Sequence, residues 1–463
     1  MTRSHTLLSI AALAATLGTA AHADDAILQK LLDEAAAASP EVGQARATVE
    51  AERARIPQAG ALPDPSLTLG IQNDGFRSFK VGTAETSYFN IMLTQPLFWP
   101  GKRGLREEVA TLEQQRAAAR LGRSVLDLEG RVRRAYVGLL LVRGRVELLA
   151  EQDLLWEQAE HTARARYESG QVPQSDLLRA QLERARLQQR HWALDAELAT
   201  RLAELDRLRA RPLEEPVPTV LRLEAVPDPA LLPEDLAQAD AAARSPELRL
   251  AGLSVEQAGR RLALAEKERY PDFSVTAAVM PRGGLEPMWQ LGVSVGLPVF
   301  AARKQGRAVE ESEQRRAGEG QGAEALKQVL GLRTHERLVA LAALNRSNAQ
   351  YRSQVLVLSA ATAKSTLSQY EVGRVPFASA LEALASYVAD RGSFLGSIAD
   401  AQLIAIAQQE VSLDSSPASA GGGPFGSPGG AMAGAGPTAS GAAIPERAGS
   451  AETGSPSRSS NGM

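Results

Sequence analysis

The chain has 463 residues, of which 44% are apolar, 23% are charged and only 4% are aromatic. This composition is typical of helical rods rich in Ala, Leu, Arg and Glu. The net charge of −3 and the interleaving of Arg with Glu argue against nucleic acid as a partner. The absence of cysteine excludes disulfides, thiol catalysis and zinc–cysteine sites.

Residues 1–23 read as a secretory signal peptide. Arg3 precedes an apolar run from Leu7 to Ala21, and the sequence Ala-His-Ala at 21–23 forms an A-x-A cleavage site. The alternative is an N-terminal membrane anchor, but the apolar run is short for a spanning helix and acidic residues follow it. We therefore expect cleavage after residue 23.

Residues 24–211 form the first of two predicted repeats, which begins with helix. Ser39-Pro40-Glu41 is a helix-start signature, because it combines an oxygen cap, a first-turn proline and an acid near the positive end of the helix dipole. From residue 65 the period of the apolar residues changes to 2. This alternation predicts a β-hairpin over 65–96 with one apolar and one polar face.

A long proline-free helix is predicted over residues 101–169. Its apolar residues recur at alternating steps of four and three, the pattern of a left-handed coiled coil: Leu121, Val125, Leu128, Val132, Ala135, Leu139, Val142, Val146 and Leu149. At ~1.5 Å per residue this helix would be a rod about 100 Å long, too long for a compact core. Gly170 and Pro173 then end it, and a return helix is predicted over 174–210.

The same order of elements recurs after a Pro-rich linker at 212–233. Residues 234–413 are predicted to hold a helix, a β-hairpin at 272–298, a long helix at 302–372 and a return helix at 376–413. Recurrence of order, spacing and local motifs predicts two tandem structural repeats. Residues 414–463, rich in Gly, Ser, Ala and Pro, are predicted to be a disordered tail.

The predicted strands are long enough for two interpretations. Strands of roughly eight to ten residues approach the ~9–11 residues that cross a bilayer as tilted β-strands. The alternative is a small sheet packed on helices, which also gives one apolar face. A sheet exposed to lipid must close on itself, and the smallest such barrels have about eight strands. Since one chain offers only four, closure would require several chains.

The order of helix, hairpin, long helix, turn and return helix, given twice after a signal peptide, resembles the TolC-type outer membrane efflux proteins. Its most specific marks are Pro-Leu-Phe-Trp-Pro-Gly-Lys at 96–102 and the paired Tyr-Glu-x-Gly-x-Val-Pro turns at 167–173 and 370–376. The resemblance covers roughly Ile27 to Leu413. It is strongest to the heavy-metal efflux branch (copper/silver or cobalt/zinc/cadmium).

The resemblance implies a mainly α fold with a β-barrel portion. The protein would be a homotrimer in the outer membrane of a Gram-negative bacterium, with a 12-stranded barrel in the lipid. A 12-helix periplasmic coiled-coil tunnel would continue the barrel. It would act as the passive exit duct of a tripartite efflux system for metal ions or small toxic compounds. Its partners would be a periplasmic adaptor (membrane fusion) protein and an inner-membrane RND-type pump.

The resemblance also assigns roles to residues at the two turns. Asp176, Tyr370 and Glu382 match residues of the family's periplasmic gate. Val375 stands where the family has a latch arginine, so Arg374, one residue away, is the candidate, and Ser379 replaces a second pore-lining acid. The adaptor-contacting residues would be Gly170, Val172, Pro173, Gly373, Val375 and Pro376. As an alternative, Asp176 caps the return helix beside Pro173, and both interpretations remain open.

No catalytic residue, cofactor or metal site is predicted. The histidines His161, His191 and His335 are scattered without ligand spacing. Three methionines, Met92, Met280 and Met288, lie in or beside strands, where they fit packing, a lumen wall or a soft-metal relay. The rival functions are a soluble periplasmic coiled-coil scaffold or adaptor protein and, with less support, a helical-bundle enzyme.

Overall fold

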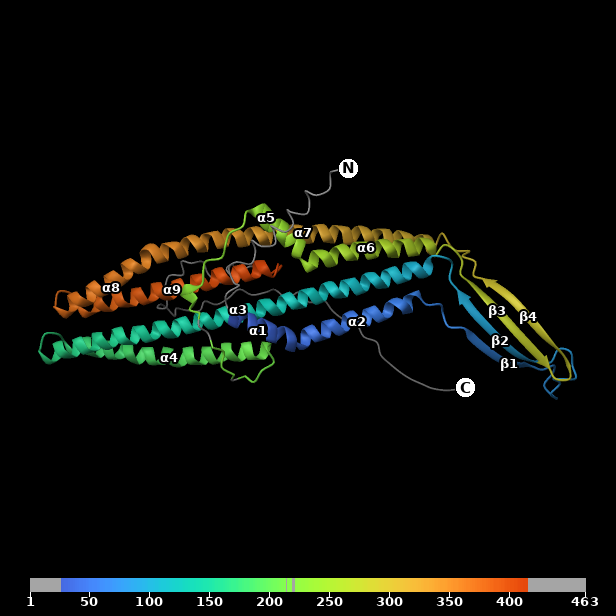
Figure 1. The fold of residues 1–463 in the computed structure, drawn as a ribbon, viewed down its shortest axis with the longest axis horizontal. Helices are drawn as coiled ribbons and strands as arrows, with labels where there is room; N and C mark the ends of the chain where they lie inside the picture. The colour runs from blue at the N-terminus through green and yellow to red at the C-terminus, as the bar shows by residue number, and fades with distance from the viewer. Residues whose placement is uncertain (1–25, 214, 219–220, 415–463) are drawn as a thin grey trace, which may run out of the picture. The chain divides into compact units, whose positions relative to one another are not determined.

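The computed structural model describes residues 26–213, 215–218 and 221–414, all within one compact unit. The predicted signal peptide and, apart from Asp414, the predicted tail lie outside the described residues. The described part is mainly helical, with one small sheet (Figure 1). Within these residues no helix combines the length and the apolar character needed to cross a membrane.

The first half of the described chain holds six elements: α1 (Ala26–Ala38), α2 (Pro40–Gly60), β1 (Ser66–Gln72), β2 (Tyr88–Leu97), α3 (Lys102–Glu168) and α4 (Gln174–Leu208). Helix α2 begins as its sequence predicts. Pro40 is its first residue, and the Ser39 hydroxyl accepts a hydrogen bond from the backbone N–H of Val42.

The second half holds nine elements in the described residues: η1 (Leu223–Ala225), α5 (Glu234–Arg244), α6 (Pro246–Lys267), β3 (Phe273–Arg282), β4 (Leu285–Val295), α7 (Gln305–Gln350), η2 (Tyr351–Val355), α8 (Leu356–Glu371) and α9 (Phe377–Gln409). Pro246 again opens a helix, and Ser245 caps it through the N–H of Leu248. The two halves thus share the order helix, two strands, long helix and return helix.

The predicted single helix over 302–372 differs from the structure in two ways. Residues 298–304 form a turn, in which Phe300 C=O accepts from the N–H groups of Arg303 and Lys304, so α7 begins only at Gln305. Further on, the π-helical turn η2 separates α7 from α8. Beside η2, Asp228 accepts hydrogen bonds from Asn348 and Arg352, which ties the linker to this point of the helix.

The return helices are shorter than predicted. They end at Leu208 and Gln409 rather than at residues 210 and 413. The reason is the same at both ends, because Ala210 and Val411 each adopt a left-handed conformation with φ of 52°. A left-handed residue after the last turn ends a helix.

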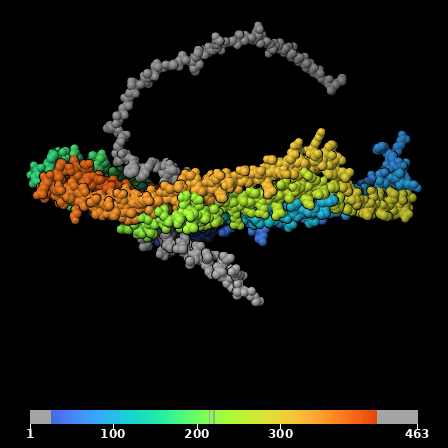
Figure 2. All heavy atoms as spheres, turned by 90° about the horizontal axis from the view of Figure 1, so that it is seen from above, coloured from blue at the N-terminus to red at the C-terminus, as the bar shows by residue number. Residues whose placement is uncertain are grey.

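The four strands form one antiparallel sheet in the order β1-β2-β3-β4. Each strand pairs with its neighbour in the chain, so β1 and β4 are edge strands. Only Gly283 and Gly284 separate β3 from β4. The sheet lies at one end of the long helices, and the α3–α4 and α8–α9 turns lie at the other (Figures 1 and 2).

Directly paired residues of neighbouring strands lie on the same face, so the register sorts the side chains into two faces. The first face, the apolar face, carries large apolar side chains, of which Leu97, Phe273 and Val275 are partly buried. The others are exposed: Leu67, Leu69, Ile71, Phe89, Ile91, Leu93, Val279, Trp289, Leu291, Val293 and Val295. The second, the polar face, carries mostly Thr, Ser, Asn, Gln and Gly. There, Thr94 pairs with Thr276, and their hydroxyl oxygens lie 3.4 Å apart.

The main core lies where α1, α3, α9 and the linker around η1 meet. The heptad residues of α3 supply much of it, with Val132 and Leu139 fully buried against Ile398 and other side chains of α9. A second cluster lies near the two turns and is built from α3, α4, α8 and α9, including Trp156, Tyr370 and Phe377. Both clusters fill the space between long helices.

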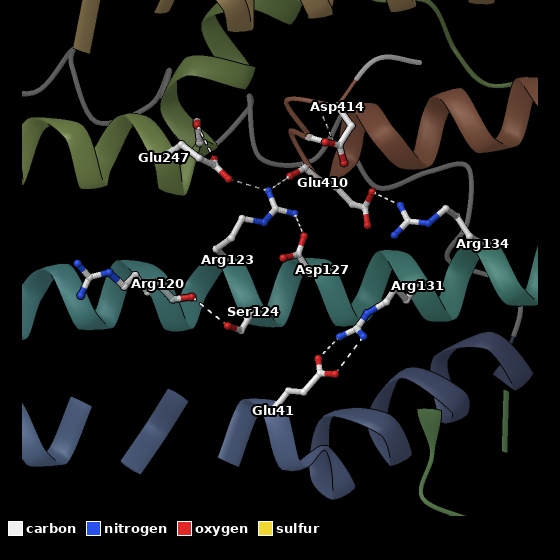
Figure 3. A network of polar contacts seen from close by, with 12 residues as sticks. Glu41, Arg120, Arg123, Ser124, Asp127, Arg131, Arg134, Glu247, Glu410 and Asp414 are labelled. Carbon is white, nitrogen blue, oxygen red and sulfur yellow. Dashed lines mark hydrogen bonds and ion pairs between the residues drawn. The ribbon is translucent and has the colours of Figure 1, made fainter. Parts of the chain in front are cut away.

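Arginines of α3 bind three other segments (Figure 3). Arg131 pairs with Glu41 of α2, and Arg123 bonds both Glu247 of α6 and the backbone C=O of Glu410 at the end of α9. The Glu410 carboxylate bonds Arg134, and Glu410 is only 2% exposed. Burial raises the pKa of Glu410 above its ordinary value, although the charge of Arg134 opposes this.

Candidate functional site

The two turns at the end of the long helices have the same backbone structure. Gly170 and Gly373 are left-handed, with φ of 70° and 77°. In each turn the glycine N–H bonds the C=O of the tyrosine three residues earlier, at 2.9 Å in both. The N–H of the residue after the glycine donates to the C=O five residues earlier. These bonds are 2.8 Å long for the N–H of Gln171 and 2.9 Å long for the N–H of Arg374. This bonding is the Schellman motif, which glycine stabilises.

We call this end of the helices the tip, and its centre is Tyr370. The residue is only 1% exposed, and its ring lies 5.2 Å from that of Phe377. From α3, the guanidinium of Arg166 lies over the same ring, 4.9 Å from its centroid, and donates a hydrogen bond to the Tyr370 C=O. The tyrosine hydroxyl has no hydrogen-bond partner among the described residues.

Asp176 contributes to the electrostatic environment of the Tyr370 hydroxyl. Burial raises the pKa of the Tyr370 hydroxyl, the negative charge of Asp176 raises it further, and the positive charge of Arg166 partly opposes both. Asp176 is therefore close enough to act on this ring. Asp176 also lies in the first turn of α4, whose N-cap is Pro173.

The structure does not bring the remaining predicted gate residues to Tyr370. Arg374 and Glu382 are exposed, and neither forms an ion pair with another residue that the structure describes. Val375 packs partly buried against the tip cluster. Of the predicted adaptor-contacting residues, Gly170, Pro173, Gly373 and Pro376 are exposed at the turns, and Val172 is partly exposed.

Sequence reasoning missed Arg166. It fills the space beside the second turn so closely that a Cβ at Gly373 would lie 2.9 Å from its Nη2 atom. The corresponding residue of the other turn is Gln369, so the internal similarity of the two turns carries no signal for an arginine here. Only the packing of α3 against α8 shows the contact.

Ion pairs hold the helices of the tip together. Arg184 of α4 binds Glu160 of α3 at 3.0 Å and Asp153 at 3.5 Å. The hydrogen bond from Arg184 lowers the pKa of Glu160, outweighing the effect of burial. Across to α8, Gln158 donates to Glu371 at 3.1 Å.

A second polar centre joins the sheet to the long helices. Lys102, only 3% exposed, donates to Asp272 and to the C=O of Tyr270, both at 2.8 Å. The backbone N–H of Trp99 also donates to Asp272. The Trp99 ring stacks on that of Tyr270, with the ring centroids 5.2 Å apart. Burial alone would raise the pKa of Asp272, but the Lys102 ammonium and the Trp99 N–H together hold it below its ordinary value.

Two of the histidines that the structure describes each pair with a single carboxylate. His191 pairs with Asp195 within α4, and His335 pairs with Glu234 of α5, each at 2.9 Å. Among the described residues no group of three His, Cys, Asp or Glu side chains could hold an ion. The described structure therefore offers three candidate functional surfaces: the helical tip, the apolar face of the sheet and the polar face of the sheet.

Comparisons with known proteins agree with this architecture. The model of the outer membrane efflux protein family matches residues 31–210. The nickel-cobalt-cadmium resistance protein NccC of Alcaligenes xylosoxydans xylosoxydans is 26% identical over 306 residues, which are 66% of this chain and 68% of NccC.

Solved channels share the fold. A structure of CusC is similar with a TM-score of 0.71 and 18% identity, covering 84% of this chain and 92% of CusC. The open state of the MtrE outer membrane channel of Neisseria gonorrhoeae gives a TM-score of 0.69 and 19% identity, covering 83% and 88%. The chain is therefore similar to the outer membrane efflux proteins over residues 31–210, and it shares the fold of solved outer membrane channels.

Proposed function

We propose that the protein is the exit duct of a tripartite efflux system. Three copies form a trimer that conducts metal ions or small toxic compounds passively from the periplasm to the exterior. A periplasmic adaptor and an inner-membrane RND-type pump deliver the substrate at the tip. The metal-resistance name of NccC supports the metal ions as cargo.

One observation carries this proposal: the sheet has a largely exposed apolar face and two unpaired edges. Trp289 and Leu69 of this face are 78% and 69% exposed, and the strand order leaves β1 and β4 each with one open side. An apolar patch of this extent marks a surface for lipid or protein. In lipid an open edge leaves backbone groups unpaired, so the sheet must close.

In this proposal three chains close the sheet. Three copies of a four-stranded sheet give 12 strands, within the range of outer-membrane barrels. The apolar face would then contact lipid, and the polar face would line a water-filled bore. The four long helical segments of each chain (α3, α4, α7 with α8, and α9) would give the 12-helix tunnel, as the two tandem repeats 24–211 and 234–413 suggest.

A pair of neighbouring residues on opposite faces tests the lipid-facing assignment. Ile91→Arg places a charge on the apolar face, where arginine at the bilayer midplane costs ~2–4 kcal/mol. Asn90→Arg, one residue away, is the matched control on the polar face, where substitution is tolerated. We expect unboiled membrane-fraction samples to show a heat-sensitive trimer for wild type and Asn90→Arg, and little for Ile91→Arg.

The rival soluble scaffold gives a different result in the same experiment. It predicts that both arginine variants behave alike and that the protein is a soluble monomer without detergent. Either outcome would remove the exit-duct proposal. Channel current across planar bilayers from the wild-type trimer completes the test.

The proposed gate lies at the tip. Asp176 and Tyr370 would hold it closed, since the buried tyrosine hydroxyl has no partner among the described residues and the aspartate charge acts on it. Arg374 and Glu382 would act at the exposed rim of the pore. We expect Asp176→Asn and Tyr370→Phe to raise the closed-state conductance of reconstituted trimers, whereas the exposed neighbour Arg179→Gln should leave it unchanged. An unaltered closed-state conductance in both Asp176→Asn and Tyr370→Phe would contradict this assignment.

A further inference from the structure

Methionine is unevenly distributed in the structure. Of the six methionines of the chain, only Met92, Met280 and Met288 fall within the described residues. All three lie on the polar face of the sheet, on three consecutive strands. Each is partly buried.

The register places the three side chains next to one another. Met280 of β3 is the direct partner of Met288 of β4. Met92 of β2 is the partner of Ala278, the residue that precedes Met280 on the same face, and Ala278 is only 4% exposed. Direct partners have Cβ atoms about 4.5–5.5 Å apart, and diagonal neighbours about 7–8 Å apart lie within reach of long side chains. The thioethers of all three methionines can therefore converge.

The three methionines belong to none of the buried apolar clusters among the described residues. The neighbouring positions of the polar face are polar or small, among them Asn90, Thr276 and Gln290, so methionine there joins no apolar core. The thioether sulfur differs from every other side chain of this face because it is a ligand for soft cations such as Cu(I). Groups of His, Cys, Asp or Glu that would hold harder ions are absent from the described residues.

We propose that Met280 and Met288, assisted by Met92, form a thioether site for a soft monovalent cation, Cu(I) or Ag(I). The cation binding rests on the sheet alone. Its place in the conduction path rests on the proposed function, under which the polar face lines the bore. A site made of neutral thioethers would bind the ion without a buried counter-charge, and a conducting pore needs binding weak enough for release.

Silver binding to the purified full chain in detergent tests the site, because Ag(I) needs no reductant. We expect calorimetric titration to find one sulfur-bound Ag(I) per chain, with sulfur ligands seen by X-ray absorption. The double variant Met280→Leu/Met288→Leu should weaken binding at least tenfold and lose the sulfur signal. Leucine keeps nearly the volume of methionine, and a heat-sensitive trimer band checks assembly.

Two controls make the result specific. Met432→Leu/Met463→Leu, which changes methionines outside the described residues, should bind Ag(I) as wild type does. Ni(II) should not compete for the site. Unchanged silver affinity in Met280→Leu/Met288→Leu, or silver held only by oxygen and nitrogen, would overturn the proposal. If silver binds as expected but no bilayer current appears, the exit-duct function fails while the thioether site stands.

Discussion

Replacing Gly130 by alanine should destabilise the protein, although the same change in most helices is favourable. Gly130 lies in α3 against Glu410, and a Cβ there would lie 1.1 Å from the Glu410 Oε1 atom. The buried carboxylate must move and lose its bond to Arg134. Overpacking costs ~1–3 kcal/mol and the lost charged bond ~1.5 kcal/mol, against a helix-propensity gain of ~0.5–1 kcal/mol. The net loss is about 1.5–4 kcal/mol.

Thermal unfolding of the purified protein, followed by circular dichroism in one detergent, measures this effect. The matched control is Gly122→Ala in the same helix, where nothing lies within 4 Å of the new Cβ, so its midpoint should rise slightly. In a Glu410→Ala background, adding Gly130→Ala should cost no further stability, because the clash partner is gone. Equal midpoints for Gly130→Ala and Gly122→Ala would refute the reasoning.

Three further effects are expected. Arg166→Gln should destabilise the tip by about 2–3 kcal/mol, because it removes the cation over the tyrosine ring and a charged hydrogen bond; faster hydrogen exchange in α8 would show it, and unchanged exchange would count against it. Asp272→Asn should cost about 1.5–3 kcal/mol in urea unfolding by leaving buried Lys102 without its carboxylate, and an unaltered midpoint would contradict this. Because Arg184 lowers the pKa of Glu160, their pair stabilises the fold at pH values above the ordinary glutamate pKa, and this stability is lost as the pH falls through the lowered pKa. Arg184→Gln should therefore reduce the dependence of the free energy of unfolding on pH in this acidic range. An unchanged pH dependence would contradict this.

Local patterns predicted the elements whose cause is local. Ser39-Pro40 and Ser245-Pro246 mark helix starts because an oxygen cap and a first-turn proline act within four residues. Gly170 and Gly373 mark helix ends because the left-handed conformation that they adopt suits glycine. The alternation of period 2 located the sheet and correctly separated its apolar side chains from its polar ones.

Features that depend on distant segments left no such pattern. No glycine or proline marks η2, and the linker residue Asp228 that bonds beside it lies more than a hundred positions away in the chain. The contact of Arg166 with Tyr370 and that of Gly130 with Glu410 likewise join helices far apart in sequence. At the site, the turns were predictable, whereas the arginine that covers the tyrosine required the fold.

The π-helical turn η2 sets the angular phase of everything that follows it in α8. A π-turn carries one residue more than an α-turn, so its loss by a single-residue deletion would rotate α8 by about 100° about its axis. Tyr370, fifteen residues beyond the end of η2, would then point away from Arg166. The orientation of the Tyr370 side chain is therefore set at η2, in the last third of the second long helical segment and fifteen residues before the tyrosine.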